Sequence, residues 1–187
     1  LGNPHRRYGT VHIAGTNGKG SVASGIASIL QASGYRVGLY TSPHLVRFNE
    51  RIQVDGREIT DEDIVRLYRR VRRALPGGRE PTFFEFTTAM ALDEFARRRV
   101  DWAVIETGMG GRLDATNVVT PAVTVSTNVS LEHRDYLGPT LSAIAFEKAG
   151  IIKRKVPVVT GVRPSAAAEV IRRTAESRSA PVFRLGR

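Results

Sequence analysis

The sequence contains no cysteine, which excludes disulfide bonds and thiolate chemistry and fits a reducing, cytoplasmic setting. No apolar run approaches the ~18 residues of a membrane-spanning helix. Residues 1–8 are too polar and basic to be the apolar part of a signal peptide. Internal repeats and low-complexity segments are also missing. At 187 residues, 41% of them apolar, the chain can bury one sizeable core, and one domain is the default expectation.

Acidic residues are scarce relative to basic ones, and the formal net charge is +10. Such an excess indicates either an anionic partner or an arginine-rich solvated surface. Much of it lies in two clusters, Arg66, Arg69, Arg70, Arg72 and Arg73 on one expected helix and Arg97, Arg98 and Arg99 at the end of another. Neither cluster is interleaved with aromatic residues, so the solvated surface is favoured and a nucleic-acid partner is not expected.

Short apolar runs alternate with helical patterns along the chain. The runs, typical of strands buried on both faces, are 11–14, 37–41, 103–106, 123–127, 156–160 and, more weakly, 182–184. The helical patterns are 22–32, 64–75, 84–98, 140–149 and 165–176. This alternation predicts an α/β fold with a mostly parallel sheet and flanking helices.

Two local signals refine this pattern. Thr60 and Asp63 form a capping signature before the helix expected at 64–75, and Pro76-Gly77-Gly78 would end that helix. Asp55-Gly56 predicts a tight turn in a small hairpin between 51–54 and 58–59.

The glycine-rich segment Gly15-Thr16-Asn17-Gly18-Lys19-Gly20-Ser21 joins the first expected strand to the first expected helix. Backbone N–H groups of such a loop, together with a helix N-terminus, form a concavity that binds phosphate. Lys19 would contact the terminal phosphates, and Ser21 would face a magnesium ion. The loop departs from the usual pattern, because Ile13 replaces its first glycine and Gly20 separates the lysine from the hydroxyl. An ordinary glycine turn is the alternative, but the flanking strand and helix favour phosphate binding.

Polar residues follow the expected strands at their carboxyl ends. Gly15 follows the first, Ser42 the second, Glu106 ends the third, and Asn128 and then His133 follow the fourth. Ligands of an open parallel sheet bind beyond these ends, so one crevice should hold a phosphate loop, a hydroxyl, a carboxylate and an imidazole. Glu106 and Ser42 supply the oxygen ligands that magnesium prefers. His133, judged by residue type alone, is as often a surface or core histidine as a ligand.

Five blocks of the chain, in order, resemble the folylpolyglutamate synthase/dihydrofolate synthase family of the Mur ligase superfamily. They are the glycine-rich loop and residues 40–52, 84–87, 106–117 and 131–153, which together span nearly the whole chain. The resemblance implies a P-loop NTPase-like Mur ligase central domain. Residues 1–187 would be its ATP-binding ligase domain, and the family's C-terminal domain would be absent from this chain.

The resemblance also implies roles for single residues. ATP would be bound by Thr16, Asn17, Gly18, Lys19, Gly20 and Ser21. Magnesium would be bound by Ser42, Glu106, His133 and Lys148, with Lys148 carbamylated, and the catalytic set would be Lys19, Glu106, His133 and Lys148. By charge alone, Lys148 would instead be a helix-end lysine favoured by the helix dipole.

Two further segments take implied roles. Pro43, Phe48, Asn49 and Arg51 would contact folate from the family's mobile loop, with a plain surface loop as the alternative. Residues 108–112 would bring backbone N–H groups and the Arg112 guanidinium near the phosphates, with a flexible turn as the alternative.

The implied reaction is ATP-dependent addition of L-glutamate to a folate or dihydropteroate carboxylate through an acyl phosphate, catalysed by positioning and electrostatics without a protein nucleophile. A Mur-type peptidoglycan amino-acid ligase is the alternative enzyme, although such ligases carry a substrate domain ahead of the ATP loop. A non-catalytic nucleotide- or nucleic-acid-binding module is the alternative outside enzymes. A monomer without a membrane partner is expected.

Overall fold

A mixed sheet carries the fold in the computed structural model, which describes residues 1–75, 77, 80–163 and 165–185. In the described residues the sheet has eight strands in the order β4-β3-β2-β5-β1-β6-β7-β8. Their bounds are β1 Gly9–Ala14, β2 Val37–Tyr40, β3 Ile52–Val54, β4 Arg57–Glu58, β5 Trp102–Glu106, β6 Val123–Ser126, β7 Val158–Thr160 and β8 Val182–Arg184. Six neighbouring strands run parallel, in the spatial order β2, β5, β1, β6, β7 and β8. Strand β3 is antiparallel to both of its neighbours, β2 and β4. The predicted mostly parallel sheet is therefore confirmed.

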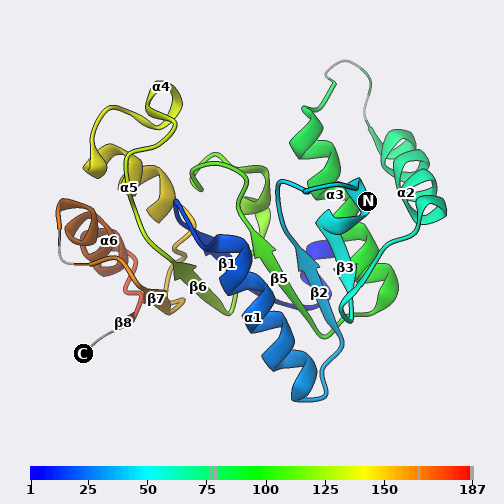
Figure 1. Cartoon of the computed structure of the whole chain (residues 1–187), viewed down its shortest axis with the longest axis horizontal. Helices are drawn as coiled ribbons and strands as arrows, with labels where there is room; N and C mark the ends of the chain where they lie inside the picture. The colour runs from blue at the N-terminus through cyan, green and yellow to red at the C-terminus, as the bar shows by residue number, and fades with distance from the viewer. Residues whose placement is uncertain (76, 78–79, 164, 186–187) are drawn as a thin grey trace.

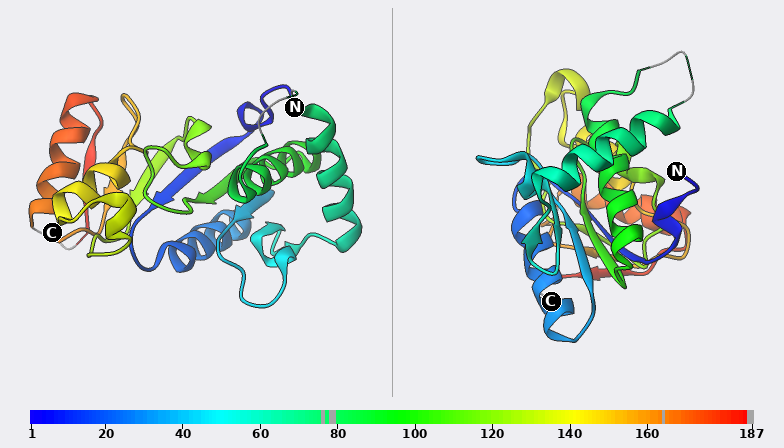
Figure 2. Two further views of the ribbon diagram at one scale, coloured as in Figure 1. Left: turned by 90° about the horizontal axis from the view of Figure 1, so that it is seen from above. Right: turned by 90° about the vertical axis from the view of Figure 1, so that its right-hand side faces the viewer.

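Helices cover both faces of this sheet (Figures 1 and 2). They are α1 Lys19–Ala32, α2 Asp61–Ala74, α3 Phe83–Arg98, α4 Arg134–Leu137, α5 Leu141–Ala149 and α6 Ala166–Ser177, with 3-10 turns η1 Pro4–Arg6, η2 Phe48–Arg51 and η3 Ala115–Val118. The right-hand view of Figure 2 shows α1 on one side of the sheet and α3 on the other. The five predicted helices are confirmed, whereas α4 and the 3-10 turns were not predicted.

The alternation of side chains along the central strands separates the core into clusters. Val11 and Ile13 of β1 pack with Ala23 and Ala27 of α1. On the opposite face, Ala103 and other strand residues pack against α2 and α3. A further cluster joins α5 and α6 to β7. Because the central strands are covered on both faces, β2 and β5 are mostly apolar, whereas β1 and β6 also bury polar residues such as His12 and Thr124.

Local signals set several boundaries. The Asp63 N–H donates to the Thr60 hydroxyl at 3.2 Å, so α2 begins at Asp61, three residues before its first apolar position. Pro76 and Gly78, predicted to end this helix, lie outside the described residues. Asp55 and Gly56 both have positive φ, as a type I′ turn requires, and the predicted hairpin is confirmed as β3 and β4.

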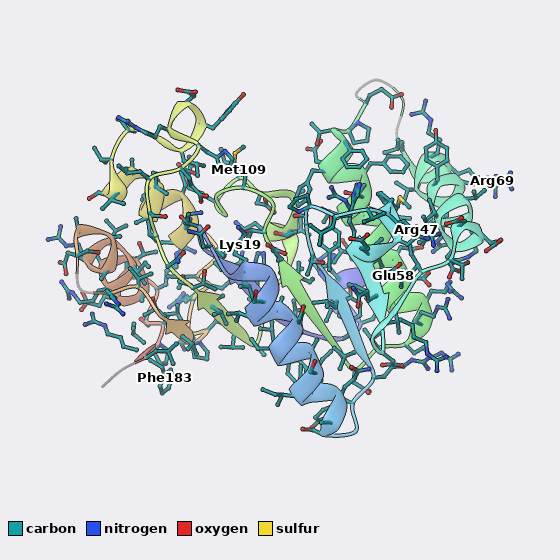
Figure 3. The ribbon with its side chains drawn as sticks, viewed as in Figure 1. Lys19, Arg47, Glu58, Arg69, Met109 and Phe183 are labelled. Atoms are coloured by element: carbon teal, nitrogen blue, oxygen red, sulfur yellow. The ribbon has the colours of Figure 1, made fainter. Side chains whose placement is uncertain are left out.

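The arginine clusters are largely paired with carboxylates. Arg66, Arg97 and Arg98 surround the buried Glu94, and Arg66 and Arg98 also bind Asp63 at 2.5 and 2.8 Å. Arg69, labelled in Figure 3, extends outward from α2. The interpretation as a solvated surface fits this arrangement. No helix in the described part of the chain has both the length and the apolar character needed to cross a membrane.

Candidate phosphate and metal site

The glycine-rich loop connects β1 to α1 through backbone conformations that require glycine. Gly15 has φ 154°, and a Cβ there would lie 1.9 Å from the Thr127 hydroxyl oxygen. Gly18 has φ 77° and precedes Lys19, where α1 begins three residues earlier than predicted. Gly18 has no side chain to cap the first turn, so the helix N-terminus retains N–H groups for an anionic ligand.

The loop that follows β6 holds the glycine-rich loop in place. The Asn17 N–H donates to the Asn128 side-chain oxygen at 2.8 Å, and the Thr16 N–H donates to the Asn128 carbonyl at 3.0 Å. The Thr127 hydroxyl donates to the Asn17 carbonyl at 2.7 Å. Sequence analysis placed Asn128 at the end of a strand but did not identify this contact, which joins residues 111 positions apart.

Lys19, Ser42 and Glu106 lie together at the carboxyl ends of the strands. The Lys19 ammonium is 3.9 Å from Glu106 and donates to the Thr16 carbonyl at 3.2 Å. The Ser42 N–H donates to the other oxygen of Glu106 at 3.1 Å. Glu106 is only 4% exposed, and this burial raises its pKa against the opposing effects of the Ser42 N–H and the Lys19 charge. Figure 3 places Lys19 where α1 meets the strand ends.

Lys148 reaches the same loop from α5. Its side chain is 2% exposed and donates to the Gly15 carbonyl at 2.8 Å and to Glu132 at 2.6 Å. Burial lowers the pKa of Lys148, although the Glu132 carboxylate opposes this shift. Lys148 does lie in the last turn of α5, as the interpretation from charge alone expects, but its side chain is buried and turns towards the glycine-rich loop.

His133 follows β6, as predicted, and precedes α4. Its backbone is left-handed, with φ 43°, and its side chain is exposed. Across residues 1–75, 77, 80–163 and 165–185, no group of three or more His, Cys, Asp or Glu side chains is arranged to hold a metal ion. Of the predicted magnesium set, the structure thus joins Ser42 to Glu106 directly, while a shared site with His133 stays a prediction.

The loop expected to contact folate is folded around Glu50, whose carboxylate accepts N–H groups from Leu45, Val46 and Arg47 at 2.6–2.9 Å. Within this loop Pro43 is exposed and Phe48 is half-buried. These contacts make the loop an ordered structure, and its contact with folate remains a prediction.

Asn49 and Arg51 in this loop are buried. The Asn49 amide donates to the Ile59 carbonyl and to Asp61, and therefore holds η2 against the start of α2. Arg51 donates to His44 at 2.7 Å and lies 5.4 Å from the centre of the Phe83 ring.

Several groups of the segment that follows β5 are paired within the protein. The N–H groups of Gly108 and Met109 donate to Asp114 at 2.9 and 3.0 Å. The Arg112 guanidinium pairs with Glu147 at 2.8 Å and lies over the Phe146 ring. Carboxylates of the chain therefore bind these groups in the structure, and their position near the phosphates stays a prediction.

Comparisons with known proteins show which family this chain resembles in sequence. Residues 13–187 match the family model described as the Mur ligase middle domain. The chain is 50% identical over 186 residues to folylpolyglutamate synthase of Lacticaseibacillus casei, and this alignment covers 96% of this chain and 44% of that protein. It is 46% identical over 187 residues to dihydrofolate synthase/folylpolyglutamate synthase of Bacillus subtilis, covering 97% of this chain and 44% of that protein.

Solved structures give the same result. A complex of FPGS with AMPPCP and folate has a TM-score of 0.94 at 48% identity, covering 98% of this chain and 46% of that one. Folylpolyglutamate synthase of Mycobacterium tuberculosis complexed with ADP has a TM-score of 0.89 at 42% identity, covering 98% and 43%. The chain thus spans less than half the length of these relatives.

Proposed function

The chain belongs to the folylpolyglutamate synthase/dihydrofolate synthase branch of the Mur ligase superfamily, and we propose that it is the ATP-binding part of a ligase that adds L-glutamate to a folate or dihydropteroate carboxylate. The observation that carries this proposal is the meeting of the glycine-rich loop, Lys19 and the buried Glu106 at the carboxyl ends of β1 and β5. A cationic loop beside a buried carboxylate suits a nucleoside triphosphate with its divalent cation.

The chemistry divides into two steps that the chain's own groups would promote by orientation. The loop N–H groups, the N-terminus of α1 and Lys19 would hold the γ-phosphate in line with the substrate carboxylate. A carboxylate oxygen bonds to the γ-phosphorus as the bond to ADP breaks, which gives an acyl phosphate. The glutamate amine then attacks the acyl carbon, loses a proton and expels phosphate. Neither step requires a nucleophile from the protein.

Magnesium fits the oxygen donors present at this site. Glu106 is buried with one N–H donor and one distant ammonium, so its carboxylate retains capacity for a cation. Ser42, whose backbone N–H meets Glu106, would supply its hydroxyl, and His133 and Lys148 would complete the set. When bound, magnesium would neutralise the phosphate oxygens during transfer.

Burial of the Lys148 amine favours its carbamylation, whereas the negative charge of Glu132 beside it opposes carbamylation. Low exposure favours the neutral amine, which is the form that reacts with carbon dioxide. The product would be anionic and would lie beside Glu132, which now binds the ammonium at 2.6 Å. Glu132 would therefore have to turn away or take up a proton when the carbamate forms.

Phosphate release by the intact protein tests the proposal. Release should require ATP, glutamate and a folate or dihydropteroate together, and the product should gain one glutamyl residue by mass spectrometry. Ligation of a UDP-muramoyl substrate with no response to folates would favour the Mur-type alternative. RNA binding without either product would favour the non-catalytic module. The cytoplasmic setting and the monomeric state stay predictions.

A further inference from the structure

A fully buried histidine lies on the strand that leads into the glycine-rich loop. His12 sits on β1 between Val11 and Ile13, which pack against α1, so its side chain points to the opposite face of the sheet. There its Nε2 is 2.8 Å from the hydroxyl oxygen of Thr116 in η3. Neither residue takes part in the proposed chemistry.

The neighbouring contacts fix the direction of this hydrogen bond. The Thr116 hydroxyl donates to the Asp114 carboxylate at 2.5 Å, which uses the only proton of that hydroxyl. Its oxygen must therefore accept from His12, so His12 carries its proton on Nε2. Burial, followed by the Lys153 charge, lowers the pKa of His12 to about 3, so the ring stays neutral near pH 7.

The second oxygen of Asp114 extends the chain of contacts to the site. It accepts the N–H groups of Gly108 and Met109, which follow Glu106 after a single residue. That intervening residue, Thr107, donates its N–H to the Ile13 carbonyl at 2.9 Å. Hydrogen bonds thus connect β1 to the main chain beyond β5, directly behind the carboxylate of the site.

The arrangement has a cost that an apolar side chain would avoid. His12 Nδ1 is buried and has no hydrogen-bond partner among the described residues. The Nε2–H group of His12 orients the Thr116 hydroxyl, so that this hydroxyl donates to the Asp114 carboxylate. A leucine or valine at position 12 would fill space without fixing this orientation.

We propose that His12 and Thr116 are positioning residues, which hold Asp114 so that it fixes the main chain of Gly108 and Met109 behind Glu106. The consequence for activity rests on the proposed ligase function, whereas the consequence for the Gly108–Met109 main chain does not. The contacts of Asn128 with the glycine-rich loop lie outside this chain of hydrogen bonds. ATP affinity should therefore depend on His12 and Thr116 far less than turnover does.

Two substitutions at one position test the proposal in the intact protein. Thr116→Val keeps the shape of the side chain and removes the hydroxyl, while Thr116→Ser keeps the hydroxyl. For Thr116→Val we expect amide hydrogen exchange at Gly108 and Met109 to become about tenfold faster and kcat to fall about tenfold, with KM for ATP within about twofold of wild type. Thr116→Ser should restore both exchange and kcat.

A matched control is Thr124→Val, which removes the hydroxyl of another fully buried threonine; Thr124 lies on β6, and its hydroxyl donates to the Pro157 carbonyl just before β7. It should leave exchange at Gly108 and Met109 unchanged. His12→Leu should reproduce the effect of Thr116→Val. Unchanged exchange in Thr116→Val, or no rescue by Thr116→Ser, would overturn the proposal. Wild-type protein without ligase activity would overturn the proposed function instead, because the exchange measurement needs no turnover.

Discussion

Replacing Glu106 by glutamine should stabilise the protein while it abolishes ligation. Glu106 is 4% exposed, and among the described residues the polar partners of its ionised carboxylate are the Ser42 N–H at 3.1 Å and the Lys19 ammonium at 3.9 Å. These contacts offset only a small part of the free energy needed to remove the carboxylate charge from water. Glu106→Gln keeps the shape and one acceptor oxygen, so we expect a free energy of unfolding ~1 kcal/mol higher near pH 7.

The gain should depend on pH in a defined direction. Burial raises the pKa of Glu106 above its unfolded value of about 4.5, so the folded protein binds this proton more tightly than the unfolded chain does. The free energy of unfolding therefore falls as pH rises from that value through the raised pKa. Glu106→Gln removes this contribution, and its gain over wild type should be larger near pH 7 than near pH 4.5.

Urea unfolding of both proteins at the two pH values measures the effect. Glu58→Gln is a matched control, because Glu58 is an exposed carboxylate on β4 (Figure 3) and should change stability by less than ~0.5 kcal/mol. A loss of stability in Glu106→Gln near pH 7, or an equal gain at both pH values, would refute the argument from burial.

Three other substitutions probe the site. Lys19→Ala should weaken Mg-ATP binding by ~1–3 kcal/mol, or about 5- to 150-fold in Kd, by calorimetry, and unchanged affinity would remove the phosphate-loop assignment. Asn128→Ala leaves the Asn17 N–H without its acceptor and should weaken ATP binding by ~1 kcal/mol in the same titration; tighter binding would contradict a role in holding the loop. Lys148→Met removes the contacts with Gly15 and Glu132, and should lower the free energy of unfolding by ~1.5–3 kcal/mol in urea, together with ligase activity. The exposed Lys155→Met is the control for both lysines, and an equal effect there would show that neither site is special.

The parts of the site that sequence predicts are those set by local pattern and by sheet topology. Gly15, Ser42 and Glu106 were placed at strand ends because apolar runs define the strands, and parallel strands bring their carboxyl ends to one edge. The structure confirms that these three lie at that edge. Their assignment needed no knowledge of which side chains touch.

The parts that sequence misses depend on contacts between distant segments. Asn128 holds the glycine-rich loop from 111 residues away, and Asp114 binds the N–H groups of Gly108 and Met109 that looked free in the sequence. Lysine is usually a surface residue, so the sequence gives no sign that Lys148 is buried; its burial depends on the packing of α5 against the loop. Residue type gives the capacity for a hydrogen bond, while the tertiary fold selects the partner.

The central position of β1 has a consequence for the order of assembly during synthesis. Gly9 pairs with Trp102 and Val11 with Val123, so roughly a hundred residues must follow β1 before either neighbour exists. At the usual pace of translation, β1 waits roughly 5–20 s as an unpaired apolar strand. The Asn128 contacts come later still, so the glycine-rich loop is completed only after the sheet has closed on both sides of β1. Under the proposed function, nucleotide would bind only after this part of the sheet has formed, so it would stabilise the sheet by mass action without guiding the nascent chain towards it.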